Sequence, residues 1–144
     1  MLDPADLIAR LKAEVPDLGD RVGGAAEWTR LTQSGAEPNV TPVAFVLPTG
    51  GVGGKHQGMT GAYVQPVDLL ISVILVLRTD TAGLRALDRV SGLIDDIIQA
   101  IAGWDIDLTG LFVFRRWQLI QAAKGTLTYE ITFSIGDTIR KATS

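Results

Sequence analysis

The stretch TLTYEITFSI, residues Thr126–Ile135, decides the fold class. Apolar and polar residues alternate along it without a break. This is the period of a β-strand, in which successive side chains point to opposite faces of the sheet. We therefore predict a strand with one face on the core and the other in water. The apolar face consists of Leu127, Tyr129, Ile131, Phe133 and Ile135, and the polar face of Thr126, Thr128, Glu130, Thr132 and Ser134.

Three further strands are expected upstream. Val67–Arg78 is almost continuously apolar, which is typical of a central strand covered on both faces by helices or another subunit. It is too short to cross a bilayer as a helix. Thr41–Pro48 lies between two prolines, as in an edge or terminal strand. Leu111–Ala122 forms the third, and the turn residues Ala123-Lys124-Gly125 predict a hairpin into the last strand.

Apolar residues recur at helical spacing over Thr81–Trp104, which predicts one long helix with Gly103 as its C-terminal cap. A first helix is predicted between Asp3, a capping residue, and Pro16, with its polar residues solvated. A second is expected from Gly24 to about Gln33. The apolar stripe of the long helix contains Leu84, Leu87, Val90, Leu93, Ile94, Ile97, Ile98 and Ile101.

These elements indicate an α+β fold: a single layer of mostly antiparallel sheet with one long helix and shorter N-terminal helices packed on it. The chain has 144 residues, of which 47% are apolar. This length and composition suit a single domain over residues 1–144 with its own core.

Composition limits the function. The formal net charge is −3 and the sequence pI is near 5.0, which argues against ordinary DNA binding. There is no cysteine, hence no disulfide, thiolate metal site or thiol nucleophile. The N-terminus, Met1 to Pro4, has neither the basic start nor the apolar core of a signal peptide, so we expect synthesis in the cytoplasm and no membrane partner.

A glycine-rich segment, Thr49–Gly61, is expected to form a loop that is mobile in the isolated chain and ordered by outside contacts. Gly54-Lys55 resembles the end of a phosphate-binding loop. However, Thr49 replaces the first glycine of that motif and His56 replaces its magnesium-binding hydroxyl residue. We therefore expect no nucleotide or other cofactor at this segment.

The residues that could support catalysis or metal binding are too few. His56 is the only histidine, so one chain cannot form a two-histidine metal site or a histidine relay. Asp105 and Asp107 are more typical of a turn than of a chelate. No serine lies in a nucleophile elbow. We expect no catalytic and no metal site, and hence no enzyme.

Two groups of residues are candidates for an interface. The first lies in and beside the glycine-rich segment: Lys55, His56, Gln57, Met59 and Tyr63. The second is Arg115-Arg116-Trp117, in which alternation places Arg115 on the face of Trp117. The arginine stem can simply pack on the indole ring. Alternatively, the pair anchors a protein contact, since Trp and Arg dominate such interfaces.

Charge is unevenly distributed along the chain. Residues 1–110 carry eight basic and fourteen acidic side chains, a net of −6, and residues 111–144 carry five and two, a net of +3. Such an asymmetry suits self-association or a polar partner, although it also arises by chance in short blocks.

The order of these elements resembles the tail terminator proteins of long-tailed bacteriophages and phage-like gene transfer particles. The resemblance covers nearly the whole chain and consists of fold-pattern features without a catalytic signature. The matching segments are Leu7–Leu11, Gly23–Ala26, Thr41–Pro48, the glycine-rich segment, Val73–Arg78, Ala100–Trp104 and Leu127–Phe133.

This resemblance implies a structural virion protein at the tail–neck junction, made in the bacterial host. It implies a homo-oligomeric ring, a hexamer, that caps the tail tube, stops its polymerisation and joins it to a head-side connector or stopper. DNA would pass through the ring without being read. Two alternatives remain: another head–tail completion protein, or a small-ligand-binding or regulatory α+β domain whose glycine-rich segment closes over a ligand.

Overall fold

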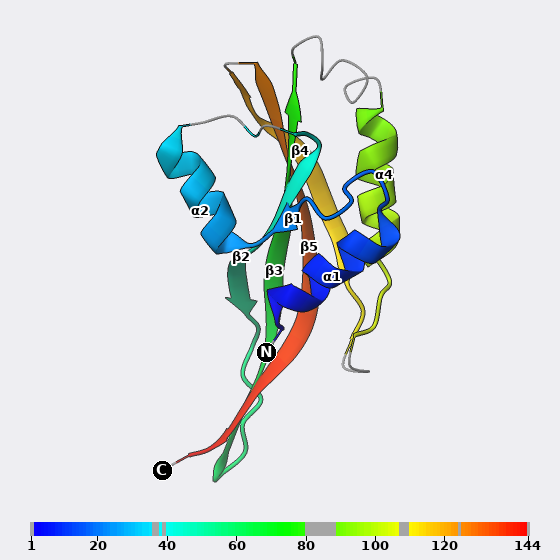
Figure 1. Cartoon of the computed structure of the whole chain (residues 1–144). Helices are drawn as coiled ribbons and strands as arrows, with labels where there is room; N and C mark the ends of the chain where they lie inside the picture. Colours follow the sequence, from blue (N-terminus) through cyan, green and yellow to red (C-terminus); the bar gives the residue numbers. More distant parts are fainter. Residues whose placement is uncertain are drawn as a thin grey trace.

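The computed structural model describes residues 2–35, 38, 40–79, 89–106, 110–123 and 125–143. Figure 1 shows a long twisted sheet with helices on both sides. The elements, in chain order, are α1 (Pro4–Glu14), β1 (Val22–Gly23), α2 (Ala25–Ser34), β2 (Val43–Gly53), β3 (Ala62–Arg78), α4 (Val90–Ile101), β4 (Val113–Ala123) and β5 (Thr126–Ala142).

The strands form one open sheet in the order β1-β2-β3-β5-β4. All neighbours are antiparallel except the short β1, which pairs with β2 in parallel. The α+β prediction is therefore confirmed. So is the central position of the Val67–Arg78 strand, which forms the buried part of β3. Its seven consecutive residues from Ile71 to Leu77 are all buried.

The main core lies between one face of the sheet and the helices α1 and α4. Ile131 and Phe133 on β5 are fully buried there, together with Leu7 and Leu11 on α1. The sequence signals of α1 are confirmed, since Asp3 caps it by accepting a hydrogen bond from the Ala5 N–H at 3.0 Å. Its apolar face therefore meets the sheet as expected.

One part of the α1 prediction is wrong. Arg10, expected to be solvated, donates from Nε to the Ala100 carbonyl on α4 at 2.9 Å. Its guanidinium carbon also lies 4.9 Å from the centre of the Trp104 ring. Arg10 therefore ties α1 to the end of α4, a long-range contact that helical periodicity cannot reveal.

The second helix, α2, lies on the opposite side of the sheet from α1 and α4 (Figure 1). Trp28 packs against Phe45 of β2 with ring centres 5.2 Å apart, and Leu31 joins this smaller cluster. Gly35, with φ +67°, ends the helix in the left-handed region that favours glycine. The predicted bounds of this helix are confirmed to within one residue at each end.

The long-helix prediction is only partly matched. The described helix α4 has twelve residues, Val90–Ile101, scarcely more than the eleven of α1. The predicted start at Thr81 lies outside the described residues. At the other end the C-cap is Ala102 and not the predicted Gly103, which follows directly with φ +78° and turns the chain away from the helix.

The expectation that the polar face of β5 is wet is wrong. Thr128, Thr132 and Ser134 are all buried. The hydroxyls of Thr132 and Ser72 lie 3.2 Å apart across neighbouring strands, and the Ser134 hydroxyl accepts a hydrogen bond from Arg115. Small hydroxyl side chains can be buried on a sheet because they satisfy one another.

Candidate interaction surfaces

The most prominent surface feature is an arm that extends beyond the helical layers. It consists of the end of β2, the start of β3 and the end of β5, which Figure 1 shows running away from the body towards the C-terminus. β3 from Ala62 to Asp68 pairs on one side with Gly136–Ala142 of β5. Residues 48–62 and 136–143 are all exposed. These two segments of the arm are therefore accessible to another molecule.

The arm corrects part of the prediction of a loop over Thr49–Gly61: residues 54–61 lie outside any strand, as predicted, but Thr49–Gly53 belongs to β2. β2 runs on through Pro48 to Gly53, with a register shift between Pro48 and Gly50 that accommodates the proline. Beyond Gly53 the pairing continues irregularly. The N–H groups of Gly54 and Gln57 donate to carbonyls of β3, each at 2.7 Å. Backbone pairing between adjacent strands therefore gives this segment a defined path, which its glycine content alone did not predict.

The arm gathers the first group of predicted interface residues at its tip. His56 stacks on Tyr63 with ring centres 5.7 Å apart, and Lys141 Nζ of β5 lies 5.6 Å from the Tyr63 ring centre. The Tyr63 hydroxyl donates to Gln65 Oε1 at 2.6 Å. Lys55, Gln57 and Met59 are exposed beside this cluster, Met59 at 80%. The tip is thus basic and partly apolar. Its neighbours on three sides fix the position of the Tyr63 aromatic ring.

The second predicted group lies at the opposite edge of the sheet, on β4. The prediction that Arg115 shares the face of Trp117 is wrong. A register shift between Phe114 and Arg116 inserts an extra residue, and Arg115 Nε donates to the hydroxyl of Ser134, 2.7 Å away. Trp117 pairs with Ile131 and lies on the other face, with its ring 6.1 Å from that of Tyr129. Such a β-bulge breaks strict alternation.

Sequence reasoning missed the apolar character of the β4 edge. Nine large apolar side chains of the described residues are strongly exposed, and five of them lie on β4 or just before it. We call these five the β4 edge patch. The adjacent pair Leu119-Ile120 is a signal, because neighbouring apolar residues in a strand cover both faces, but only the sheet order shows that the strand is an edge. The patch comprises Leu111, Val113, Trp117, Leu119 and Ile120.

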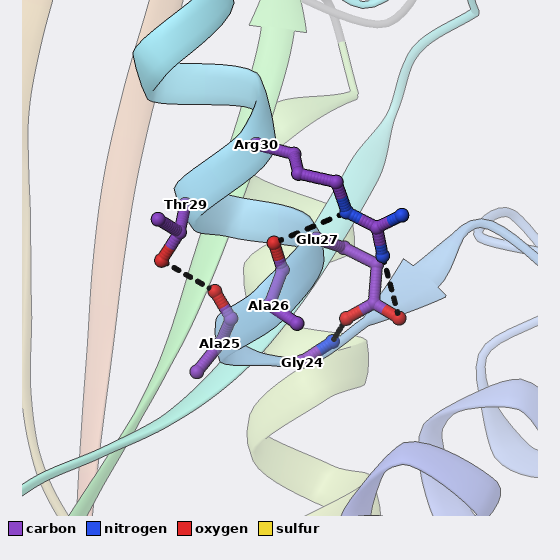
Figure 2. A network of polar contacts seen from close by, with 6 residues as sticks. All are labelled: Gly24, Ala25, Ala26, Glu27, Thr29 and Arg30. Atoms are coloured by element: carbon purple, nitrogen blue, oxygen red, sulfur yellow. Dashed lines mark hydrogen bonds and ion pairs between the residues drawn. The ribbon is translucent and has the colours of Figure 1, made fainter.

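Charged groups elsewhere support local structure. Figure 2 shows the start of α2, where Glu27 Oε2 accepts a hydrogen bond from the Gly24 N–H at 2.9 Å. This bond, helped by the N–H of Glu27 itself, lowers the pKa of the Glu27 carboxyl. Arg30 lies 3.8 Å from the same side chain. The arrangement stabilises the start of the helix.

Within the described part of the chain, no three His, Asp or Glu side chains gather closely enough to hold a metal ion. The backbone of Asp105 forms an isolated antiparallel β-bridge with Leu111, whereas Asp107 lies outside the described residues. None of the described helices is both long and apolar enough to cross a membrane.

A family model described as phage tail terminator protein matches residues 1–144. A search of curated proteins finds no match.

Proposed function

The chain belongs to the phage tail terminator family, and on that basis we propose that it assembles into a sixfold ring that caps the tail tube. The ring stops polymerisation of the tube and joins it to the head-side connector or stopper at the tail–neck junction. The family is structural, and membership places the protein in the virion tail. DNA passes through the ring without sequence recognition.

The observation that carries the proposal is the family match over the entire chain. The geometry supports it, because the arm carries the exposed Lys55 and His56 and contributes no residue from 48–68 to either hydrophobic core cluster. The outer strands of the arm, the end of β2 and the end of β5, have strand edges that no described strand pairs with, and such edges are templates for contact with another chain. We propose that the arm binds the tube or the connector through this tip.

The physical requirement for termination is simple. A tube of identical subunits stacked head to tail presents the same adhesive surface after every ring, so growth stops only when a different subunit binds that surface without regenerating it. The two ends of this sheet are different: the arm projects from one, and the β4–β5 hairpin closes the other (Figure 1). A ring built from such subunits has two unlike faces.

Electron microscopy of particles made without this protein tests the proposal. We expect tubes longer than normal and heads without attached tails. Tails of normal length on filled heads would refute termination and favour the ligand-binding alternative. Normal tails separated from heads would instead indicate another head–tail completion protein.

A second experiment separates the arm from the fold. Replacing residues 54–66 by a two-residue turn between the paired residues Gly53 and Val67 removes Lys55, His56 and Tyr63, whereas the buried core is untouched. We expect the purified variant to keep its melting temperature and to lose binding to tail tubes. Normal tube capping by this variant would refute the role of the arm tip.

A further inference from the structure

We infer that neighbouring copies of this chain join edge to edge, with β4 of one copy pairing antiparallel to the outer edge of β2, Val46–Gly53, of the next. This inference rests on the proposed ring and specifies the contact that builds it. It predicts a sheet that continues from subunit to subunit.

Both edges are open in the described part of the chain. β4 is the last strand of the sheet and pairs only with β5. At the other end, β1 covers only Ala44 and Phe45 of β2, so no described strand pairs with the outer edge of β2 from Val46 onward. Two unpaired edges on one subunit are templates for further strand pairing.

The two edges have complementary shapes. The β4 edge patch places bulky side chains on its strand, with Trp117 and Leu119 about half exposed. The outer part of β2 contains Gly50, Gly51 and Gly53. A glycine in a strand often marks the close approach of another backbone, and a bulky cross-strand neighbour can cover it.

The subunit itself does not explain two of these glycines. A Cβ atom added to Gly50 would lie 3.6 Å from its nearest neighbour, Leu70, and one added to Gly51 would lie 3.8 Å from Leu69, both ordinary contact distances. Neither residue has the left-handed φ that favours glycine. A Cβ atom would therefore fit at both positions within the isolated subunit, so a neighbouring chain supplies a reason why both residues are glycine.

Strand direction is also compatible. Along the sheet, β2, β3, β5 and β4 alternate in direction. Rotation about a ring axis keeps the direction of each strand relative to the axis, so the β2 of the next copy runs antiparallel to β4. The alternation therefore continues across the junction, and every contact in the ring is the same head-to-tail contact.

Charge disfavours the symmetric alternative. Joining β4 to β4 about a twofold axis would place Arg115 and Arg116 of both copies in one seam. The head-to-tail arrangement instead places these arginines against Val46–Gly53, which contains no charged residue, so like charges do not meet in the seam.

Cysteine pairs test the contact, since the chain contains no cysteine of its own. Val113→Cys or Leu119→Cys on β4 is combined with Pro48→Cys or Val52→Cys on β2, all at exposed positions. β2 and β4 are three strand spacings apart within one subunit, about 14 Å. A disulfide needs Cα atoms within about 7 Å, so a bond between these positions must join two copies.

Under mild oxidation we expect at least one of the four pairs to produce a ladder of covalent multimers in non-reducing gels, while each single variant gives no more than dimers. A control pair, Thr32→Cys with Gln99→Cys on exposed helix positions, should give no ladder. Efficient dimers from Leu119→Cys alone would support twofold pairing and overturn the inference.

Rings visible by electron microscopy without a ladder from any pair would overturn the edge contact and leave the proposed function intact. Failure of the unmodified chain to form rings, in solution or on tail tubes, would refute both. These outcomes distinguish the contact from the function.

A glycine substitution provides an independent readout. The Cβ of Gly51→Val meets only ordinary contact distances at an exposed position, so we expect the melting temperature to be unchanged or slightly raised, because valine favours strands. In the assembled ring, the valine side chain would lie at the proposed contact with β4 of the next copy. We therefore expect Gly51→Val to abolish the oligomers that sedimentation velocity detects. Gly92→Ala, which fills an exposed glycine on α4, is the matched control and should assemble normally. Equal assembly of both variants would contradict the inference.

Discussion

Replacing Ile131 by alanine should destabilise the subunit more than any comparable change on the arm. Ile131 is fully buried on β5 and lies between Val73 of β3 and Trp117 of β4 in the pairing register. Truncation removes three carbon atoms, worth roughly 2.4 kcal/mol at about 0.8 kcal/mol each. The cavity left behind brings the expected loss to about 3–4 kcal/mol.

Ile139→Ala is the matched control, because it removes the same atoms from the same strand at a residue that is 46% exposed. Because the side chain is about half exposed, truncation removes only about half of the transfer free energy, and it leaves no cavity. We therefore expect the free energy of unfolding to fall by about 1 kcal/mol. Urea denaturation of the monomer measures both. A domain of this size has a stability of about 5–15 kcal/mol, so both variants should remain folded in water. Equal losses, or less than about 1 kcal/mol for Ile131→Ala, would refute the assigned core.

Three further predictions concern polar groups and the arm. In a double-mutant cycle of Thr132→Val and Ser72→Ala, measured by urea denaturation, we expect a coupling free energy of about 0.5–1 kcal/mol between the two hydroxyls. Additive losses of stability would show that the hydroxyls do not interact. Folding lowers the pKa of the Glu27 carboxyl below its ordinary value of 4.5. The ionised carboxyl therefore stabilises the fold above pH 4.5, and this contribution is lost as the pH falls through the pKa of the folded state. The Gly24 amide resonance should therefore move below pH 4.5 in the native chain and not in Glu27→Gln, and identical titrations would contradict this assignment. Limited proteolysis of the isolated subunit should cut first within residues 54–61 and should spare them after assembly, whereas equal cleavage in the particle would exclude protection.

The sheet was predictable where the backbone period alone determines the outcome. The alternation of Thr126–Ile135 and the apolar run Val67–Arg78 identified β5 and the centre of β3, because side-chain direction follows from strand geometry. Caps were equally local: Asp3 and Gly35 act within a few residues of the helix ends that they define.

The failures share a different cause, since each depends on a partner distant in sequence. Thr132 is polar and buried because Ser72, sixty residues away, supplies a hydroxyl. Arg115 changes face because a bulge against β5 adds a residue. The Thr49–Gly53 segment is a strand because β3 pairs with it, despite its glycines. Strand propensity is weak compared with such tertiary contacts.

The same dependence explains why only one of the two candidate interaction surfaces could be proposed from the sequence. The tip residues from Lys55 to Tyr63 could be proposed because they are close in sequence and flanked by glycine, but the β4 edge patch becomes visible only when β4 is known to be the last strand. If the sheet edges join the copies laterally, they are not available for stacking along the tube. The contacts above and below the ring then fall to the ends of the strands, which differ: the arm at one end and the β4–β5 hairpin at the other (Figure 1). A ring with identical lateral seams and unlike faces can bind a tube through one face without offering the next ring the same surface, which is the geometry that termination requires.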